Sequence, residues 1–290
     1  MTPKILIARL FIFFAGLPAV VALIIFLPHY NHLALNALVI LVSMLGAAEF
    51  ARMLRFKGFE LKTAEAVLLG CLSPVSMTLI VSFDTNYQIT QSLFVIGASW
   101  LLVSEVFIHH QNFSSALHRV TAGFAVMMYP GLFLSWTIHM ASLKHATMVI
   151  LGFSLTVIAN DSIAWACGNL FGRNNRGIFK ASPGKSLAGF IGGLASSVAV
   201  CVLLVIFFPA SYESDQISPI PSGVILGLLS GIAVTFGDLS ESVLKRCCGL
   251  KDSGYLIPGR GGVLDSVDSF AFSAPVFYIL FRYFFDGAHN

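Results

Sequence analysis

The sequence has few charged residues. Asp, Glu, Lys and Arg make up only 11% of its 290 residues, whereas apolar residues make up 57%. An ordinary soluble domain contains roughly 25% charged residues, and a soluble chain of this length could not hide so much apolar surface inside one core. The scarcity of charge therefore argues against a soluble globular protein, and we expect the chain to lie in a lipid bilayer.

Motifs for metal binding through sulfur and for redox chemistry are also missing. The five cysteines form no CxxC pair and show no His-linked metal spacing. The adjacent Cys247 and Cys248 are interpreted as incidental rather than as a redox pair. The net charge of +3 says little about partners, and no nucleic-acid partner is expected.

Long apolar runs fill most of the chain. A membrane-spanning helix needs about 20 mostly apolar residues, and unpaired backbone groups are costly in hydrocarbon, so helical spans are expected. The pattern predicts an all-α polytopic membrane protein with about nine transmembrane helices in a single membrane domain, residues 1–290. The predicted spans are 5–27, 33–51, 64–83, 90–108, 120–139, 146–168, 186–208, 221–237 and 269–285. The first is interpreted as a retained helix, because it is too long for a signal peptide and lacks a cleavage site.

The positions of the basic residues indicate the orientation. With a cytoplasmic N-terminus, every Lys and Arg except Lys144 and Arg282 falls in a cytoplasmic segment, as the positive-inside rule requires. The acidic stretch 211–215 falls on the opposite side. The two longest polar segments, 169–185 and 238–268, are then both expected to face the cytoplasm, where nucleotides are found.

The second of these polar segments concentrates carboxylates and cations. Four polar residues recur at steps of three and four and so lie on one helical face: Asp238, Glu241, Ser242 and Lys245. Asp265 and Asp268 share a face if the next helix has begun there. Solvated salt bridges would account for such groups. However, ligands that are all oxygen suit a hard cation such as Mg²⁺, and adjacent cations suit a phosphate-bearing substrate. Together they indicate metal-assisted phosphoryl or nucleotidyl transfer at the membrane surface.

Two helices carry local signals. Ser182 is predicted to cap the helix of the 186–208 span, with Pro183 at its first position. Lys185 would then lie in the first turn, where a bound anion explains a cation that the helix dipole disfavours. A small face for close packing against another helix is predicted by glycines at four-residue spacing in the 221–237 span, namely Gly223, Gly227 and Gly231.

Residues 242–270, here called the signature segment, resemble the signature of the phosphatidate cytidylyltransferases, also called CDP-diacylglycerol synthases. That signature runs Ser-x-x-Lys-Arg, then Lys-Asp, Pro-Gly-His-Gly-Gly and Asp-Arg-x-Asp, and this chain reads "SVLKRCCGLKDSGYLIPGRGGVLDSVDS". The residues in register are Ser242, Lys245, Arg246, Lys251, Asp252, Gly261, Gly262, Asp265 and Asp268. Upstream, "NDSIAWACGNLFGR" and "SPGKS" resemble a second region of the family, and "AAEFARML" is similar to its second-helix pattern, which would explain Glu49.

The resemblance implies a reaction in which CTP and phosphatidate give CDP-diacylglycerol and pyrophosphate for phospholipid biosynthesis. It implies Mg²⁺ as cofactor, with a monovalent cation such as K⁺ assisting. The implied partners are CTP, phosphatidate in the bilayer, other membrane lipids and a second copy of the chain in a homodimer. The implied location is the inner membrane of the cell, with the active site facing the cytoplasm and built from the polar segments 160–189 and 238–269.

The resemblance also assigns roles to residues. It makes Asp238, Asp265 and Asp268 the metal ligands, and Asp265, Asp238 and Lys245 the catalytic residues. The substrate-binding residues that it implies are Asp161, Ser182, Lys185, Ser242, Arg246, Lys251 and Arg260.

Two residues of the signature segment depart from the family pattern. Arg260 occupies the position of the family's His, and Ser266 that of its Arg. Because Arg260 lies in a glycine-flanked loop, its guanidinium is expected to replace the missing arginine in part.

Three other functions stay open: a CTP-dependent lipid kinase, which would release CDP; a paralogue acting on another lipid phosphate; and an ion-coupled transporter. The last is disfavoured because the charges cluster at cytoplasmic ends and no internal repeat is found.

Overall fold

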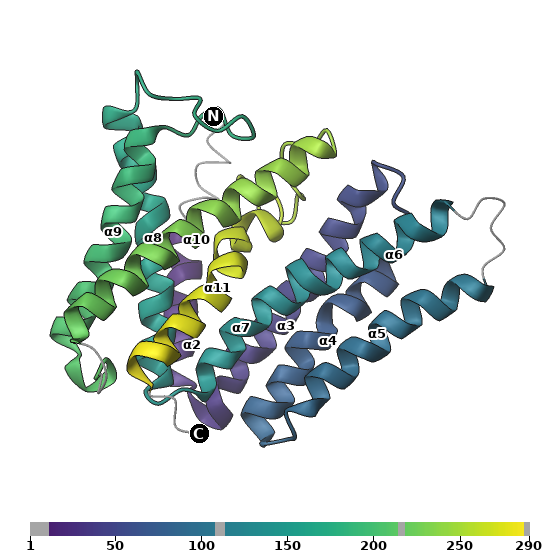
Figure 1. Cartoon of the computed structure of the whole chain (residues 1–290), viewed down its shortest axis with the longest axis horizontal. Helices are drawn as coiled ribbons and strands as arrows, with labels where there is room; N and C mark the ends of the chain where they lie inside the picture. The colour runs from purple at the N-terminus through teal and green to yellow at the C-terminus, as the bar shows by residue number, and fades with distance from the viewer. Residues whose placement is uncertain (1–11, 108–113, 214–217, 287–290) are drawn as a thin grey trace. The chain divides into compact units, whose positions relative to one another are not determined.

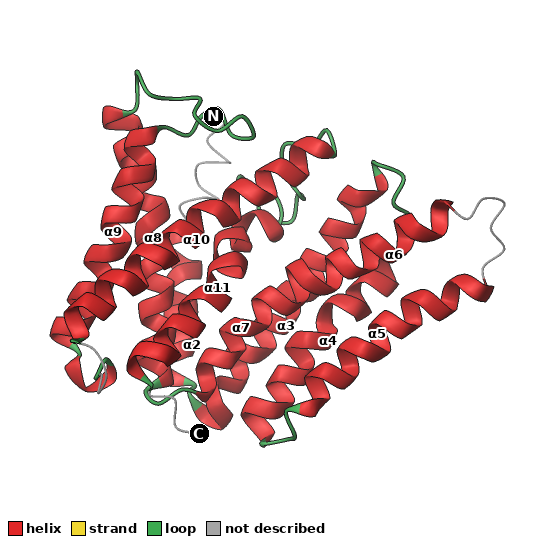
Figure 2. Ribbon diagram, in the orientation of Figure 1, coloured by secondary structure: helices red, strands yellow, loops and turns green. Residues whose placement is uncertain are grey.

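The chain is built from helices. The computed structural model describes residues 12–107, 114–213 and 218–286, and this part of the chain contains no β-strand (Figure 2). Within it, eight helices are long and apolar enough to cross a membrane, and a shorter apolar helix, Phe14–Phe26, precedes them. The all-α polytopic fold is thereby confirmed. The start of the first predicted span, residues 5–11, lies outside the described residues.

Figure 1 labels most of the helices in chain order. Their bounds are η1 (Ile12–Gly16), α2 (Leu17–Phe26), α3 (His29–Arg55), α4 (Thr63–Phe83), α5 (Gln88–Phe107), α6 (Ser114–Val126), η2 (Met127–Phe133), α7 (Leu134–His139), η3 (Met140–Ser142), α8 (Ala146–Phe171), α9 (Leu187–Phe207), η4 (Pro209–Ser211), α10 (Pro219–Cys247) and α11 (Leu264–Phe285). The π-helix η2 contains Pro130. Because proline has no N–H to donate and its ring crowds the preceding turn, it interrupts the regular α-helical ladder here.

Two helices extend well past the apolar runs that predicted them. Helix α10 continues to Cys247, ten residues beyond the predicted end at 237, and α11 begins at Leu264 instead of 269. Asp238 and Lys245 therefore lie on α10, and Asp265 and Asp268 on α11. Asp265 and Asp268 are therefore three residues apart on the same helix, as the expectation of a shared face requires.

Two compact units make up the chain. Unit 1 comprises Met1–His139 and Lys245–Val267, and unit 2 comprises Met140–Leu244 and Asp268–Asn290. Most of α10 belongs to unit 2 and its last residues to unit 1, whereas α11 begins in unit 1 and continues in unit 2. That these units form a single membrane domain stays a prediction.

Unit 1 is centred on α3 and α4, which pack along each other (Figure 1). The buried Ser43 hydroxyl lies 2.9 Å from the carbonyl oxygen of Gly70 on α4 and 2.5 Å from that of Pro130 in η2. A Cβ at Gly70 would lie only 2.5 Å from the Ala47 Cβ of α3. The absence of a side chain at Gly70 thus permits the close approach. The Ser43 hydroxyl can donate to either of the two backbone carbonyls, one at a time, which lowers the cost of burying them in an apolar interior.

Unit 2 uses the predicted glycine face of α10. A Cβ at Gly227 would lie 2.6 Å from the Ser197 carbonyl oxygen of α9, and one at Gly231 would lie 2.9 Å from the Ser197 Cβ. Asn160 of α8 donates from Nδ2 to the Ser197 hydroxyl at 2.8 Å. The glycine face is therefore confirmed as a packing surface, and its partner is α9.

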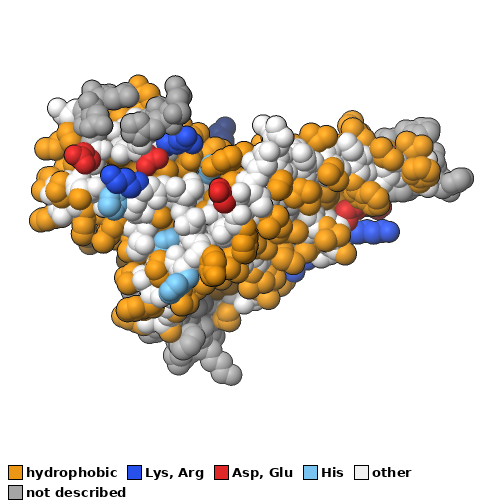
Figure 3. Space-filling model, turned by 90° about the horizontal axis from the view of Figure 1, so that it is seen from below, with side chains coloured by type: hydrophobic (Ala, Val, Ile, Leu, Met, Phe, Trp, Pro, Cys, Tyr) orange, Lys and Arg blue, Asp and Glu red, His pale blue; other side chains and the backbone are white. Residues whose placement is uncertain are grey.

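The surface is largely apolar. Apolar side chains cover most of the face seen in Figure 3, and charged side chains on it are few. On α5 only Gly97 and Leu101 are buried, whereas Trp100, Val106 and Phe107 are exposed. Apolar exposure on this scale is unfavourable in water and suits lipid. The chain is an integral membrane protein.

Cysteine labelling provides a test of the predicted orientation. Helix α9 has 21 residues and is about 30 Å long. Lys180 precedes this helix in the sequence and Glu213 follows it. In a variant lacking the five native cysteines, we expect a Lys180→Cys thiol to react with an impermeant maleimide only from the cytoplasmic side. A Glu213→Cys thiol should react only from the other side. Reaction of both from one side would contradict the nine-span topology.

Candidate active site

A lysine–aspartate ion pair lies within the signature segment in unit 1. Lys245 is in the last turn of α10, and Asp265 is in the first turn of α11. The Lys245 Nζ lies 2.5 Å from Asp265 Oδ1, and the two side chains are only 11% and 6% exposed. Solvent and salt screen such a pair weakly, so each group restricts the position of the other.

The second oxygen of Asp265 accepts from three donors. Its Oδ2 lies 2.7 Å from Ser253 N, 2.8 Å from Ser253 Oγ and 2.7 Å from Gly262 N. Hydrogen bonds to a carboxylate are stronger than those between neutral groups. With donors on both oxygens, the carboxylate is held in one orientation relative to the loop that follows α10.

Glycine makes room for this carboxylate. Gly261 has a φ of +112°, which other residues rarely adopt, and a Cβ there would lie 2.5 Å from Asp265 Oδ2. Gly261 N donates to the Ile257 carbonyl, and Ile257 N donates to the Gly261 carbonyl, which closes a tight turn. Arg260 lies in this turn and is exposed.

A second lysine–aspartate pair lies in unit 2. The Lys185 Nζ is 2.6 Å from Asp238 Oδ2, and the side chains are 27% and 34% exposed. Ser242 donates from Oγ to Asp238 Oδ1 at 3.4 Å, as expected for residues four apart on one helical face. This ion pair brings the segment that precedes α9 to the C-terminal part of α10. The predicted segments 160–189 and 238–269 thus meet through Lys185 and Asp238.

The predicted helix cap at Ser182 is wrong. The cap of α9 is Ser186, whose Oγ accepts from Gly189 N at 3.1 Å. Ser182 instead begins a turn in which its carbonyl accepts from Lys185 N, with Pro183 at the second position, where its fixed φ is favourable. Lys185 therefore precedes the helix rather than lying in its first turn.

The other predicted site residues lie on several elements of the two units. In unit 2, Asp161 is half-buried on α8, and Asp268 is 8% exposed on α11 and accepts from Ser269 N. In unit 1, Arg246 donates to the Leu250 carbonyl, and Lys251 is exposed. The structure thus joins Lys245 to Asp265 and Lys185 to Asp238 and Ser242, whereas the roles of the remaining residues stay predictions.

The sequence pattern did not identify Ser253 as part of the site. This residue is fully buried and contacts Asp265 through both its N–H and its hydroxyl. The only signal was the small pair Ser253–Gly254, which indicates a turn but does not reveal its partner. Arg52 of α3 was missed as well; it donates to the Ser253 carbonyl at 2.7 Å, and its guanidinium lies 5.1 Å from the centre of the Tyr255 ring.

The carboxylates differ in how well they fit Mg²⁺. Asp238 fits best, because its side chain is one-third exposed and its Oδ1 accepts only a long hydrogen bond, from Ser242 at 3.4 Å. Its other oxygen, Oδ2, pairs with Lys185. Asp265 has a saturated Oδ2, so only Oδ1, which now faces Lys245, suits a cation. Among the described residues no three His, Cys, Asp or Glu side chains gather as a metal site. Mg²⁺ commonly binds through one or two carboxylates together with substrate phosphates, and the donors present are of that kind.

The cysteines form no disulfide bond. All five are free thiols. Burial, with a smaller contribution from neighbouring Cys247, raises the pKa of the Cys248 thiol, although Lys57 opposes the shift. A raised pKa disfavours the thiolate, which is the reactive form. The interpretation of Cys247 and Cys248 as incidental is consistent with this environment.

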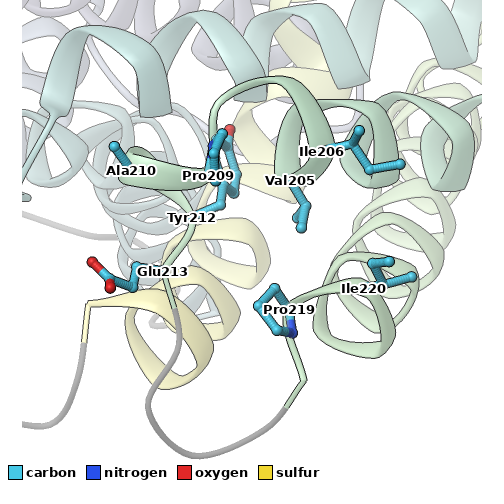
Figure 4. Close-up of a pocket in the computed structure, with 8 residues that line it drawn as sticks. All are labelled: Val205, Ile206, Pro209, Ala210, Tyr212, Glu213, Pro219 and Ile220. Atoms are coloured by element: carbon cyan, nitrogen blue, oxygen red, sulfur yellow. The ribbon is translucent and has the colours of Figure 1, made fainter.

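A separate pocket lies at the other end of α9 in unit 2 (Figure 4). Its volume is about 530 Å³. Its lining is apolar apart from Tyr212 and Glu213 and consists of Val205, Ile206, Pro209, Ala210, Tyr212, Glu213, Pro219 and Ile220. It contains no basic residue that could hold a phosphate, and Lys185 lies at the opposite end of the same helix. The pocket is therefore not a candidate for nucleotide binding.

Comparison with known proteins identifies a family. A sequence model of the Cytidylyltransferase family matches residues 7–284. The phosphatidate cytidylyltransferase of Thermotoga maritima is 32% identical over 237 residues, which cover 78% of this chain and 83% of that protein. The phosphatidate cytidylyltransferase of Staphylococcus haemolyticus is 28% identical over 270 residues, which cover 91% of this chain and 96% of that protein.

Other relatives match over a smaller part of their length. The uncharacterized protein YnbB of Escherichia coli is 31% identical over 205 residues, which cover 66% of this chain and 63% of that protein. The chain spans only 38% and 37% of the length of two chloroplast phosphatidate cytidylyltransferases of Arabidopsis thaliana.

Proposed function

Because this chain belongs to the cytidylyltransferase family, we propose that it transfers the cytidylyl group of CTP to phosphatidate, giving CDP-diacylglycerol and pyrophosphate. The observation that carries this proposal is that two lysines predicted to serve the site each pair with an aspartate predicted to bind the metal. Lys245 and Asp265 are in contact at a buried position, and Lys185 and Asp238 are in contact at a more open one. Relatives that share this family are named for the same reaction.

The reaction places little demand on a general base. An oxygen of the phosphatidate phosphate attacks the α-phosphorus of CTP, and a new P–O bond forms. The bond from the α-phosphorus to the oxygen that bridges to the β-phosphorus breaks, and pyrophosphate leaves with that oxygen and its electron pair. Since the nucleophile is already an anion, the main barrier is the approach of two polyanions, which positioned cations lower.

The lysines are the residues that meet this demand. Lys245 is held at Asp265 and is 11% exposed, so its ammonium has one well-defined position. Lys185 is 27% exposed beside Asp238 and can turn toward a phosphate without leaving a deeply buried carboxylate unpaired. Ser182, Ser242, Asp161, Arg246, Lys251 and Arg260 are proposed as the further substrate contacts.

Asp238, Asp265 and Asp268 are proposed to hold Mg²⁺, with K⁺ as an assisting monovalent cation. When bound, Mg²⁺ neutralises phosphate oxygens and polarises the phosphorus that is attacked. We further propose that the protein resides in the inner membrane as a homodimer, among membrane lipids, with its site open to cytoplasmic CTP. The family match argues against the transporter alternative.

Labelled CTP tests the proposal directly. Purified protein would be mixed with CTP labelled in the base, Mg²⁺ and phosphatidate in detergent micelles. Label should enter the lipid phase only when all components are present. A lipid kinase would leave the cytidine label in water as CDP. A paralogue would label the lipid phase only when another lipid phosphate replaces phosphatidate.

The two departures from the family pattern lead to a further prediction. Arg260→Ala should lower the transfer rate about ten- to a hundredfold, because a hydrogen bond to a charged group contributes about 1.5–3 kcal/mol. Ser266→Arg in the Arg260→Ala background should restore much of the loss. Arg173→Ala, which removes another exposed arginine, serves as the control and should change little. Initial rates of lipid labelling measure all three effects. An Arg260→Ala variant with the wild-type rate would show that Arg260 does not replace the arginine that the family has at the position of Ser266.

A further inference from the structure

A buried glutamate of α3 contacts the start of α11. Glu49 is 5% exposed. Its Oε1 accepts from Val263 N at 3.0 Å, and its Oε2 accepts from Leu264 N at 2.9 Å. The Ser253 hydroxyl lies 3.1 Å from the same Oε2. All of these residues belong to unit 1. The carboxylate therefore joins α3 to the loop and helix that carry Asp265.

The contact explains how the start of α11 is stabilised. The first amides of a helix have no partner within the helix, and the helix dipole makes this end attractive to negative charge. Glu49 accepts from two of these amides, and the Ser253 hydroxyl accepts from a third, Asp265 N, at 3.3 Å. A side chain from elsewhere in the sequence thus caps the helix directly before Asp265.

One hydroxyl links Glu49 to Asp265. Ser253 Oγ lies 3.1 Å from Glu49 Oε2 and 2.8 Å from Asp265 Oδ2. A hydroxyl carries a single proton, so it can donate to only one of the two carboxylates at a time. A displacement of Glu49 therefore changes the hydrogen bonding available to Asp265.

Two glycines make the close approach of Glu49 possible. A Cβ at Gly254 would lie 2.1 Å from Glu49 Oε1, and one at Gly262 would lie 2.3 Å from Glu49 Oε2. Arg52, one helical turn after Glu49, donates to the Ser253 carbonyl at 2.7 Å. Helix α3 thus holds Ser253 at its hydroxyl and at its carbonyl, in a loop whose glycines fit the carboxylate.

We propose that Glu49 is a positioning residue for cytidylyl transfer, which fixes Asp265 through the first amides of α11 and the Ser253 hydroxyl. The inference rests on the proposed function. Glu49 itself does not touch substrate. Its contribution is to hold the Asp265 carboxylate, and with it the Lys245 ammonium, in the orientation seen here.

Glu49→Gln is the first test. The carboxamide has one oxygen and one NH₂ group. Its nitrogen must therefore face at least one of the groups that now donate a hydrogen bond to the carboxylate. We expect kcat to fall at least tenfold while the KM for CTP changes less than about twofold. Hydrogen exchange in a peptide that covers residues 253–268 should accelerate, while exchange in α4 stays as in the wild type. Glu60→Gln, an exposed glutamate of the same unit, is the control and should behave as wild type.

Gly254→Ala gives a second perturbation that leaves the Glu49 side chain itself unchanged. Its Cβ would lie 2.1 Å from Glu49 Oε1 and 2.9 Å from the Gly262 Cα, so Glu49 and the loop at Gly262 must move apart from it. It should reproduce the kcat loss and the faster exchange. Gly46→Ala on α3 is its control, since a Cβ there makes only ordinary contacts at 3.5 Å. If hydrogen exchange in Glu49→Gln accelerates throughout the chain, that variant is destabilised as a whole. The kcat and the exchange of Gly254→Ala then decide whether Glu49 positions Asp265.

Wild-type kcat in both variants would overturn the positioning role, as would a loss of kcat with unchanged exchange at 253–268. A wild-type protein without any transfer would instead refute the proposed function. In that case the exchange comparison would still report whether Glu49 holds the start of α11.

Discussion

Asp265→Asn is expected to lower the rate of cytidylyl transfer about a hundredfold or more, in a protein that still inserts and folds. The amide keeps the shape of the carboxylate but has a single acceptor oxygen. If this oxygen takes the place of Oδ2 and accepts from Ser253 N and Gly262 N, the NH₂ group faces the Lys245 ammonium. The variant therefore removes a charge and releases Lys245 while the loop keeps its hydrogen bonds.

The initial rate of label transfer from CTP to lipid measures this effect, with size-exclusion elution and thermal unfolding as checks on the fold. Asp84→Asn is the matched control, because Asp84 is exposed at the end of α4 with a φ of 53°, a conformation that asparagine also adopts. A loss of less than about tenfold in Asp265→Asn, with a normal control, would indicate that Asp265 serves only the structure.

Asp238→Asn is expected to cause a loss of similar size. Asp238 is the most open of the proposed metal ligands, and its Oδ2 now neutralises Lys185 at 2.6 Å. The substitution removes a ligand for Mg²⁺ and leaves the lysine without its partner. Because Asp238 and Asp265 are proposed to serve the same cation, the double variant should be little slower than the slower single variant.

Rates of the two single variants and the double variant, measured at saturating CTP, test this coupling. Independent effects would multiply, so that two hundredfold losses would give about ten-thousandfold in the double variant. Mild losses that multiply would contradict a shared cation and favour purely structural roles.

The helical fold could be predicted from the sequence because lipid restricts the possible structures so strongly. Apolar runs locate the spans, since a helix is the structure that satisfies its own backbone in hydrocarbon. The helix ends could not be located in this way. Asp238 and Lys245 lie on a helix that extends past its apolar run to Cys247, and hydropathy alone does not distinguish such an extension from a loop. The prediction of Ser182 as a cap depends on the following proline, which suits a helix start. In the structure this proline lies in a turn, and Ser186 caps the helix.

In the site, only contacts between residues close together in the sequence could be predicted. The contact of Ser242 with Asp238 follows from a four-residue step on a helix. The contact of Lys185 with Asp238 depends on how α9 and α10 pack, and that packing is set by glycines whose partner the sequence does not name. The contact of Glu49 with Ser253 joins residues 204 positions apart. Composition carries no signal for such a pair, and the resemblance suggested Glu49 without giving it a role.

Phosphorus NMR of the complete reaction tests the central claim most directly. Phosphatidate in micelles, CTP, Mg²⁺ and the purified protein would be followed over time without any label. The account predicts that the phosphatidate resonance declines as the two diphosphate resonances of CDP-diacylglycerol grow, with one pyrophosphate released for each lipid converted. Formation of CDP together with a phosphorylated lipid, and no pyrophosphate, would contradict it.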